Sequence, residues 1–156
     1  EIREYFEQRY FAHGHTYTMH PVCLAAASAA IDEYKRLAAS GLLEAVANHL
    51  ASRLHELGQA HPCVGDVRGL GHFWALELVR DRERKLPFAE PNAGPRAAPR
   101  MSERLASAAL RHGIHVAAWS RCLIVAPPLV ASAADIDEGV QVLDRVLSIA
   151  DQGAIG

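Results

Sequence analysis

The residues best suited to chemistry gather in one polar run near the start of the chain, from His13 to Pro21. Gly14, Thr16 and Thr18 offer backbone N–H groups and hydroxyls in a segment without regular periodicity, a combination that suits a phosphate group. The three histidines of the run could instead bind a metal ion, although no carboxylate or cysteine stands among them. A polar turn that leads into a helix is the third interpretation, and the residues alone leave all three open.

Two later segments have both a chemical and a structural interpretation, and a third has a structural one. Arg68, before Gly69 and Gly71, could clamp a carboxylate or a phosphate with its planar fork, or stand in an ordinary glycine turn. Trp119 beside Arg121 could line a pocket or cap the edge of a sheet. Pro127 and Pro128 follow an apolar stretch and indicate a rigid exit from a strand, which is a structural role.

Composition restricts the class of protein. The chain has 156 residues, half of them hydrophobic, and a formal net charge of −2, which predicts neither a nucleic acid nor an anionic membrane as partner. No apolar run approaches the roughly 20 residues that span a bilayer. Cys23, Cys63 and Cys122 are odd in number and lack CxxC spacing, so we expect no disulfide framework, no zinc site and a reducing cytoplasm. The start lacks Met and a signal peptide, which predicts an interior cut or a processed end.

Hydrophobic periodicity and turn residues predict the elements that must position these side chains. The predicted helices cover residues 22–39, 43–57, 99–112 and 133–150, and the predicted strands cover 64–68, 72–79, 114–118 and 123–126. Pro21 suits a first helical turn, Gly41 a helix stop, and Ser132 with Asp135 a capping box. Residues 80–98 are charged and rich in Pro and Gly, and we expect a mobile loop there. The fold class is α+β, with a small, mainly antiparallel sheet covered by helices on one face.

Taken in order, three segments resemble the class III aminotransferases, which depend on pyridoxal phosphate (PLP). Residues 13–22, His-Gly-His-Thr-Tyr-Thr-Met-His-Pro-Val, are similar to the HGxTYxxHPV signature of that family. Residues 65–71, Gly-Asp-Val-Arg-Gly-Leu-Gly, resemble its GDVRGxG turn, and residues 126–129, Ala-Pro-Pro-Leu, resemble its closing APPL. The three blocks span nearly the whole chain.

The resemblance implies PLP as cofactor and a homodimer of the fold type I architecture. By position, Thr16 would bind the phosphate of the PLP held by the neighbouring subunit. Residues 1–40 would be the end of the large PLP domain and the start of a long linking helix, and residues 41–156 the small C-terminal domain. The activity implied is transfer of an amino group from an amine or ω-amino acid to a 2-oxo acid.

Two departures from the family pattern bear on that activity. The family's Schiff-base lysine lies upstream of the Thr16 segment, while Lys35 and Lys85 stand among charged residues, so we expect the chain by itself to be inactive. Many members place a substrate-carboxylate arginine where this chain has Ala117 or Ala118. Arg121 could take over that role, or the substrate lacks a carboxylate at that end.

Two other readings remain compatible with the residues. The whole protein could be an aminomutase or a decarboxylating transaminase of the same family. The chain could also be a non-catalytic α+β module for regulation or interaction.

Overall fold

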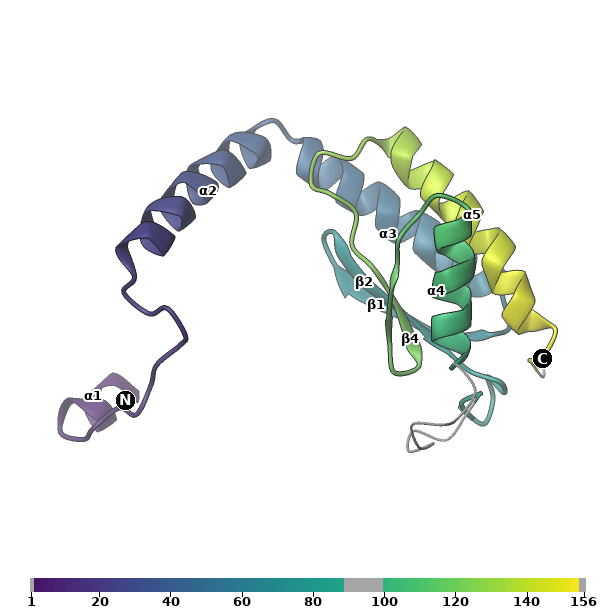
Figure 1. Cartoon of the computed structure of the whole chain (residues 1–156), viewed down its shortest axis with the longest axis horizontal. Helices are drawn as coiled ribbons and strands as arrows, with labels where there is room; N and C mark the ends of the chain where they lie inside the picture. Colours follow the sequence, from purple (N-terminus) through teal and green to yellow (C-terminus); the bar gives the residue numbers. More distant parts are fainter. Residues whose placement is uncertain (1, 89–99, 155–156) are drawn as a thin grey trace. The chain divides into compact units, whose positions relative to one another are not determined.

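The computed structural model describes residues 2–88 and 100–154 (Figure 1). The chain divides into two units, Glu1–Ser40 and Gly41–Gly156. In the part of the chain that is described, no helix has the length and apolarity needed to cross a membrane.

The first unit contains two helices joined by irregular backbone. Helix α1 covers Ile2–Glu7 and helix α2 covers Pro21–Ala39, as the alanine-rich run and Pro21 predicted. Between them lies the polar run, which includes a turn over residues 16–19. Neither helix has a buried residue, and Tyr10 and Phe11 are exposed. The first unit therefore has no hydrophobic core of its own among its described residues.

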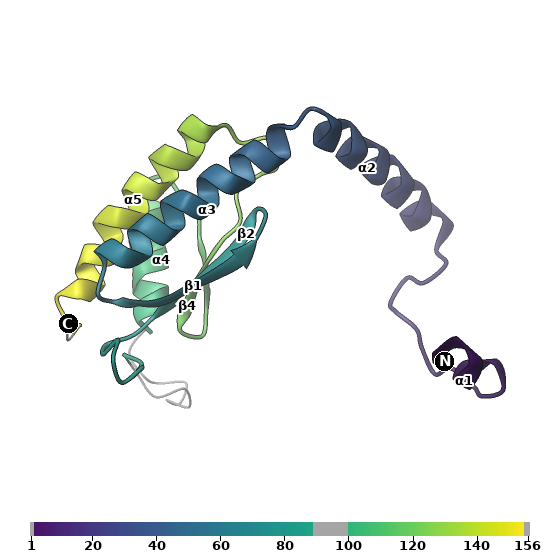
Figure 2. The same cartoon turned by 180° about the vertical axis from the view of Figure 1, so that it is seen from behind.

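The second unit is a four-stranded antiparallel sheet with three helices on one face (Figures 1 and 2). Its elements in chain order are α3 (Leu42–Ala60), β1 (Val64–Leu70), β2 (Phe73–Leu78), α4 (Met101–Arg111), β3 (Ala117–Trp119), β4 (Cys122–Val125) and α5 (Ala133–Asp151). The strand order is β1-β2-β4-β3. This arrangement confirms the predicted α+β fold with helices on one face.

The core lies between the sheet and the helices because each element is apolar on one side. Helix α3 buries residues at steps of three and four, and strand β2 buries every second residue. The fully buried leucines are Leu50, Leu54, Leu76, Leu78, Leu105, Leu123, Leu143 and Leu147. Each contributes roughly 1.5–3 kcal/mol by leaving water.

The other side of the sheet, which we call the open face, carries a different set of side chains. Strand pairing aligns them in two rows, because residues opposite each other in antiparallel strands point to the same side. The first row is Ala117, Ile124, Ala75, Arg68, and the second is Trp119, Cys122, Glu77, Asp66. A bulge at Gly65 shifts the register of β1, so Val64 enters the core while Asp66 faces Glu77 on the open face.

Two sequence predictions differ from the structure. The strand predicted at 114–118 covers only Ala117–Trp119, because the N–H of Ile114 instead bonds the carbonyl of Ala109 at the end of α4. The predicted mobile loop 80–98 begins with an ordered turn closed by a bridge between Asp81 and Leu86. Its residues 89–98 lie outside the described residues.

The capping box predicted at the start of α5 is present: the Ser132 hydroxyl accepts from the N–H of Asp135 at 3.2 Å. Replacing Ser132 by Ala should lower the free energy of unfolding by about 1 kcal/mol, since the N–H of Asp135 loses its acceptor and the Asp135 carboxylate loses the hydroxyl that donates to it. Urea denaturation measures the change. Ser148→Ala is the matched control, because that hydroxyl only bonds a carbonyl of its own helix, that of Asp144. Equal losses for both variants would contradict the prediction.

Candidate active-site residues

Thr16 begins the turn between α1 and α2, and its hydroxyl has no partner among the described residues. The neighbouring Thr18 differs, because its Oγ1 donates to the carbonyl of His15 at 2.5 Å and accepts from the N–H of His15 at 2.8 Å. Tyr17 and Met19 hold positive φ angles of 62° and 65°, which keeps the backbone tightly turned. Thr18 therefore shapes the turn, and Thr16 presents an exposed hydroxyl that fits an external phosphate.

The three histidines of this run do not gather as a metal site. His13 and His15 stack edge to face with ring centroids 4.5 Å apart, while the ring of His20 packs against Tyr17. Within residues 2–88 and 100–154, the one group of three potential metal ligands is His61, Cys63 and Asp151.

His61 and Cys63, in the segment between α3 and β1, are hydrogen-bonded to Asp151 of helix α5. His61 Nδ1 lies 2.6 Å from Asp151 Oδ2, and His61 Nε2 lies 3.1 Å from Asp144 Oδ1. Two ligands of one tetrahedral zinc ion stand about 3.3 Å apart, so the 2.6 Å contact leaves no room for an ion between them. Burial, followed by the nearby Asp151, raises the pKa of the Cys63 thiol, which keeps it protonated.

Arg121, the candidate for substrate binding, lies in the two-residue turn between β3 and β4. Its Nε forms an ion pair with Glu77 Oε1 at 2.8 Å, and its side chain is 50% exposed. The other oxygen of Glu77 accepts from Arg68 Nη1 at 2.6 Å, and the same Nη1 is 2.8 Å from Asp66 Oδ2. The hydrogen bonds that Arg68 donates to Asp66 and Glu77 raise its pKa, so it stays charged. Two arginines and two carboxylates thus form a charge-balanced network on the open face.

The structure also distinguishes the two alanines at the position of the family's arginine. Ala117 pairs with Ile124 and points to the open face, whereas Ala118 pairs with the buried Leu123 and points toward the core. Of the two alanines, Ala117 is therefore the one that faces the open side of the sheet.

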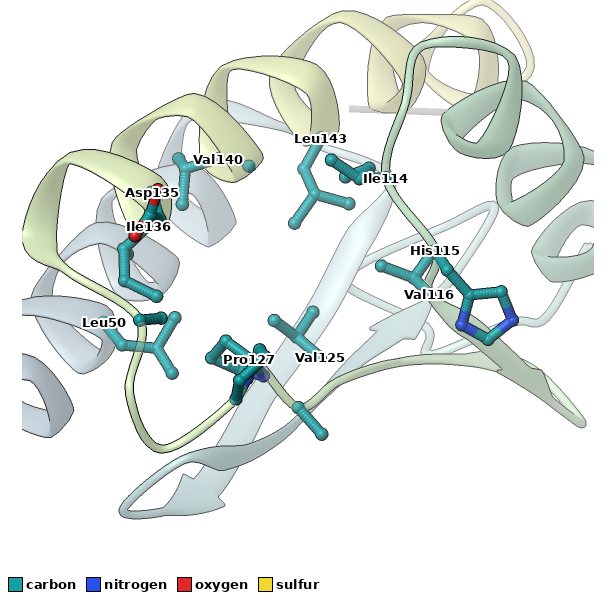
Figure 3. Close-up of a pocket in the computed structure, with 14 residues that line it drawn as sticks. Leu50, Ile114, His115, Val116, Val125, Pro127, Asp135, Ile136, Val140 and Leu143 are labelled. Atoms are coloured by element: carbon teal, nitrogen blue, oxygen red, sulfur yellow. The ribbon is translucent and has the colours of Figure 1, made fainter. Parts of the chain in front are cut away.

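The apolar cavity in Figure 3 lies on the helix side of the sheet and has a volume of about 280 Å³. Its walls come from α3, α5 and the segments on either side of the β3–β4 hairpin, including Leu50, Val125 and Leu143. The ring of His115 points away from the other labelled side chains, and the carboxylate of Asp135 is bonded within the capping box. None of the side chains labelled in Figure 3 therefore offers the cavity a free polar group that could orient a substrate.

Neither lysine has the surroundings of a catalytic base. Lys35 is exposed on α2 and lies 3.4 Å from Asp32 Oδ1. Lys85 is exposed in the turn before Leu86. A lysine becomes a base near neutral pH when burial removes water from its ammonium group, and neither side chain is buried.

Comparison with known proteins identifies the family. The model of the family "Aminotransferase class-III" matches residues 1–147. The chain belongs to the class III aminotransferases. This aminotransferase chain is 35% identical, over 146 residues, to an uncharacterized aminotransferase of Sinorhizobium fredii, with 91% of the chain and 30% of the relative covered. It is 32% identical, over 141 residues, to the putrescine–pyruvate aminotransferase of Pseudomonas aeruginosa, covering 88% of the chain and 28% of that relative.

A solved structure agrees with the family assignment. The aminotransferase chain resembles an amine transaminase from an uncultivated Pseudomonas species in its PLP-bound form, with a TM-score of 0.70 and 32% identity. The match covers 90% of the chain and 30% of that structure. The chain therefore has the fold of the small domain of fold type I enzymes, and PLP is the cofactor of its family. It spans about 30% of the length of the curated relatives it matches.

Sequence analysis missed two of these clusters. Glu77 and Arg121 are 44 positions apart in the chain, and His61 and Asp151 are 90 apart. The alternation of Glu77 with the apolar residues Leu76 and Leu78 was a signal that its side chain faces away from the core. No signal in the sequence placed Arg121 beside it, because that contact depends on β2 pairing with β4.

The hydrogen bonds that Asp151 accepts from His61 and Cys63 should make the free energy of unfolding depend on pH in the acid range. Burial would raise the pKa of this carboxyl, but hydrogen bonds from Cys63 and His61 outweigh burial and lower it. Its stabilisation is therefore present above the unfolded pKa and is lost as the pH falls below about 4, through the lowered pKa.

Asp151→Asn should cost about 1–3 kcal/mol at neutral pH and lose part of that acid dependence. Urea denaturation at pH values from about 3 to about 7 measures both effects. Glu138→Gln, an exposed change on the same helix, is the control. A variant that keeps the full acid dependence of the parent would contradict this role for Asp151.

Proposed function

We propose that this chain is part of an aminotransferase that moves an amino group from an amine or an ω-amino acid to a 2-oxo acid. The family match over residues 1–147 is the observation that carries the proposal. The activity printed for the Pseudomonas aeruginosa relative, with putrescine and pyruvate, supports this class of donor and acceptor. The cytoplasmic location expected from the cysteines belongs to the same proposal.

The role of this chain is to hold the cofactor and to line the substrate site. When bound, PLP supplies the electron sink for amino transfer and carries the amino group between the two substrates. Thr16 would donate its free hydroxyl to the phosphate of the PLP held by the neighbouring subunit of a homodimer. The tight turn that Thr18 closes with His15 fixes where that hydroxyl points. Arg121 would bind the carboxylate of the 2-oxo acid through its exposed end.

The two units have separate places in this proposal. Residues 1–40 would complete the large PLP domain and begin the linking helix, which agrees with the exposed faces of α1 and α2. Residues 41–156, with their own core, would be the small C-terminal domain. The chain by itself would be inactive, because its two lysines are exposed and the family's Schiff-base lysine lies upstream of the Thr16 segment.

The test is an assay of the full-length protein with PLP, an ω-amino acid or amine donor, and pyruvate. Formation of alanine with loss of the donor would support the proposal. A rearranged amino acid formed without consuming pyruvate would indicate an aminomutase. No reaction with any donor, together with no PLP binding, would favour a non-catalytic module.

Thr16→Ala should weaken PLP binding by the full-length protein about tenfold or more, because one charge-assisted hydrogen bond to a phosphate contributes about 1.5–3 kcal/mol. Titration of the cofactor-free protein with PLP, followed by absorbance, measures the change. Thr16→Ser keeps the hydroxyl and should restore most of the affinity. Equal affinity of the Ala variant and the parent would refute this role for Thr16.

A further inference from the structure

We propose that Glu77 is a positioning residue that fixes the guanidinium of Arg121 so that its outer edge binds the carboxylate of the 2-oxo acid substrate. The inference rests on the proposed function and extends it to a residue outside the three segments that resemble the family. It rests on the contact between Glu77 and Arg121, and on how the sheet arranges the charges around them.

Glu77 is well placed to hold another side chain still. It lies on β2, a central strand, and its side chain is only 17% exposed although it faces the open side of the sheet. Arg68 occupies its Oε2 at 2.6 Å, which fixes the carboxylate from the β1 side. The remaining oxygen, Oε1, therefore has a defined position from which to form an ion pair with Arg121.

Arg121 is held by Glu77 at one atom and is free at the others. The ion pair with Glu77 uses Nε at 2.8 Å, and among the described residues neither Nη group has a partner. The backbone is fixed as well, since the carbonyl of Arg121 accepts from the N–H of Leu78 at 2.9 Å. An arginine binds a carboxylate in two-pronged fashion through neighbouring N–H groups, so the free Nη edge has the geometry for an anionic ligand.

The charges around Glu77 separate two roles that it could have. Arg68, Asp66 and Arg121 all stand near it on the open face, and the four side chains sum to zero charge. If Glu77 only weakened the positive charge of Arg121, its removal would strengthen binding of an anion. If Glu77 positions Arg121, its removal frees a long side chain on a hairpin turn and weakens binding. The sign of the change in KM therefore distinguishes the two roles.

The experiment compares Glu77→Gln with the parent in the full-length protein. We expect the KM for pyruvate to rise about five- to tenfold, because an Arg121 side chain without its ion pair must lose rotamer freedom before it can bind the carboxylate. The KM for an amine donor without a carboxylate should stay within about twofold, because such a donor has no carboxylate for Arg121 to bind. In Arg121→Gln the KM for pyruvate should rise at least as much, and adding Glu77→Gln to it should cause no further rise.

Asp66→Asn is the matched control, because it removes one negative charge from the open face without a contact to Arg121. It should leave the KM for pyruvate within about twofold of the parent. Arg121→Lys is a second test that leaves the bond between Arg68 and Glu77 in place; it should raise the KM for pyruvate, since lysine has no planar fork.

Three outcomes would overturn the proposal. The first is a lower KM for pyruvate in Glu77→Gln. The second is an equal rise in the KM for pyruvate and in the KM for the amine donor. The third is a KM for pyruvate that rises further when Glu77→Gln is added to Arg121→Gln. A parent protein without transaminase activity would overturn the proposed function as well, whereas an active parent whose KM is insensitive to Glu77 would overturn only the role of Glu77.

Discussion

The rest of the second unit depends on the packing of α3 and α5 against one face of the sheet. Leu50, Leu54, Leu143 and Leu147 leave water almost completely in this contact. Successive side chains of a strand point to opposite faces of the sheet. When the apolar residues of β2 and β4 pack against the helices, the residues between them must therefore lie on the opposite face. A shift of one residue in register would expose Leu76 and bury Glu77. The core thus determines which charged residues stand on the open face.

The polar groups of this unit serve two different purposes. His61, Asp144 and Asp151 tie the connection between α3 and β1 to helix α5, and Arg82 strengthens that connection by donating to the carbonyls of Gly58, His61 and Val64. Arg82 thereby supplies a side-chain donor to the carbonyl of Gly58 in the last turn of α3, where the donors of the helix run out. The network around Glu77 differs, because the Nη groups of Arg121 have no partner among the described residues and can still bind an anion.

Much of the architecture was predictable because its signals are local. The apolar periodicity of α3 and α5, the alternation in β2, Pro21 at the start of α2 and the Ser132 capping box all lie within a few residues of the structure they specify. The strand predicted at 114–118 was too long because Ile114 and Val116 are apolar for another reason. They help to line the cavity beside α5 rather than a ladder of strands.

The sequence by itself determined the class of elements, their order and, through three short segments, the resemblance that led to Thr16 and PLP. Such motifs can be read from the chain because their residues are adjacent and meet their ligand as one piece of backbone. Only the tertiary structure decided that Ala117 rather than Ala118 faces the open side, that Arg121 is ion-paired with Glu77, and that His61 meets Asp151. These contacts join residues from separate strands and helices, and their formation depends on strand register and core packing, which no short segment of sequence contains.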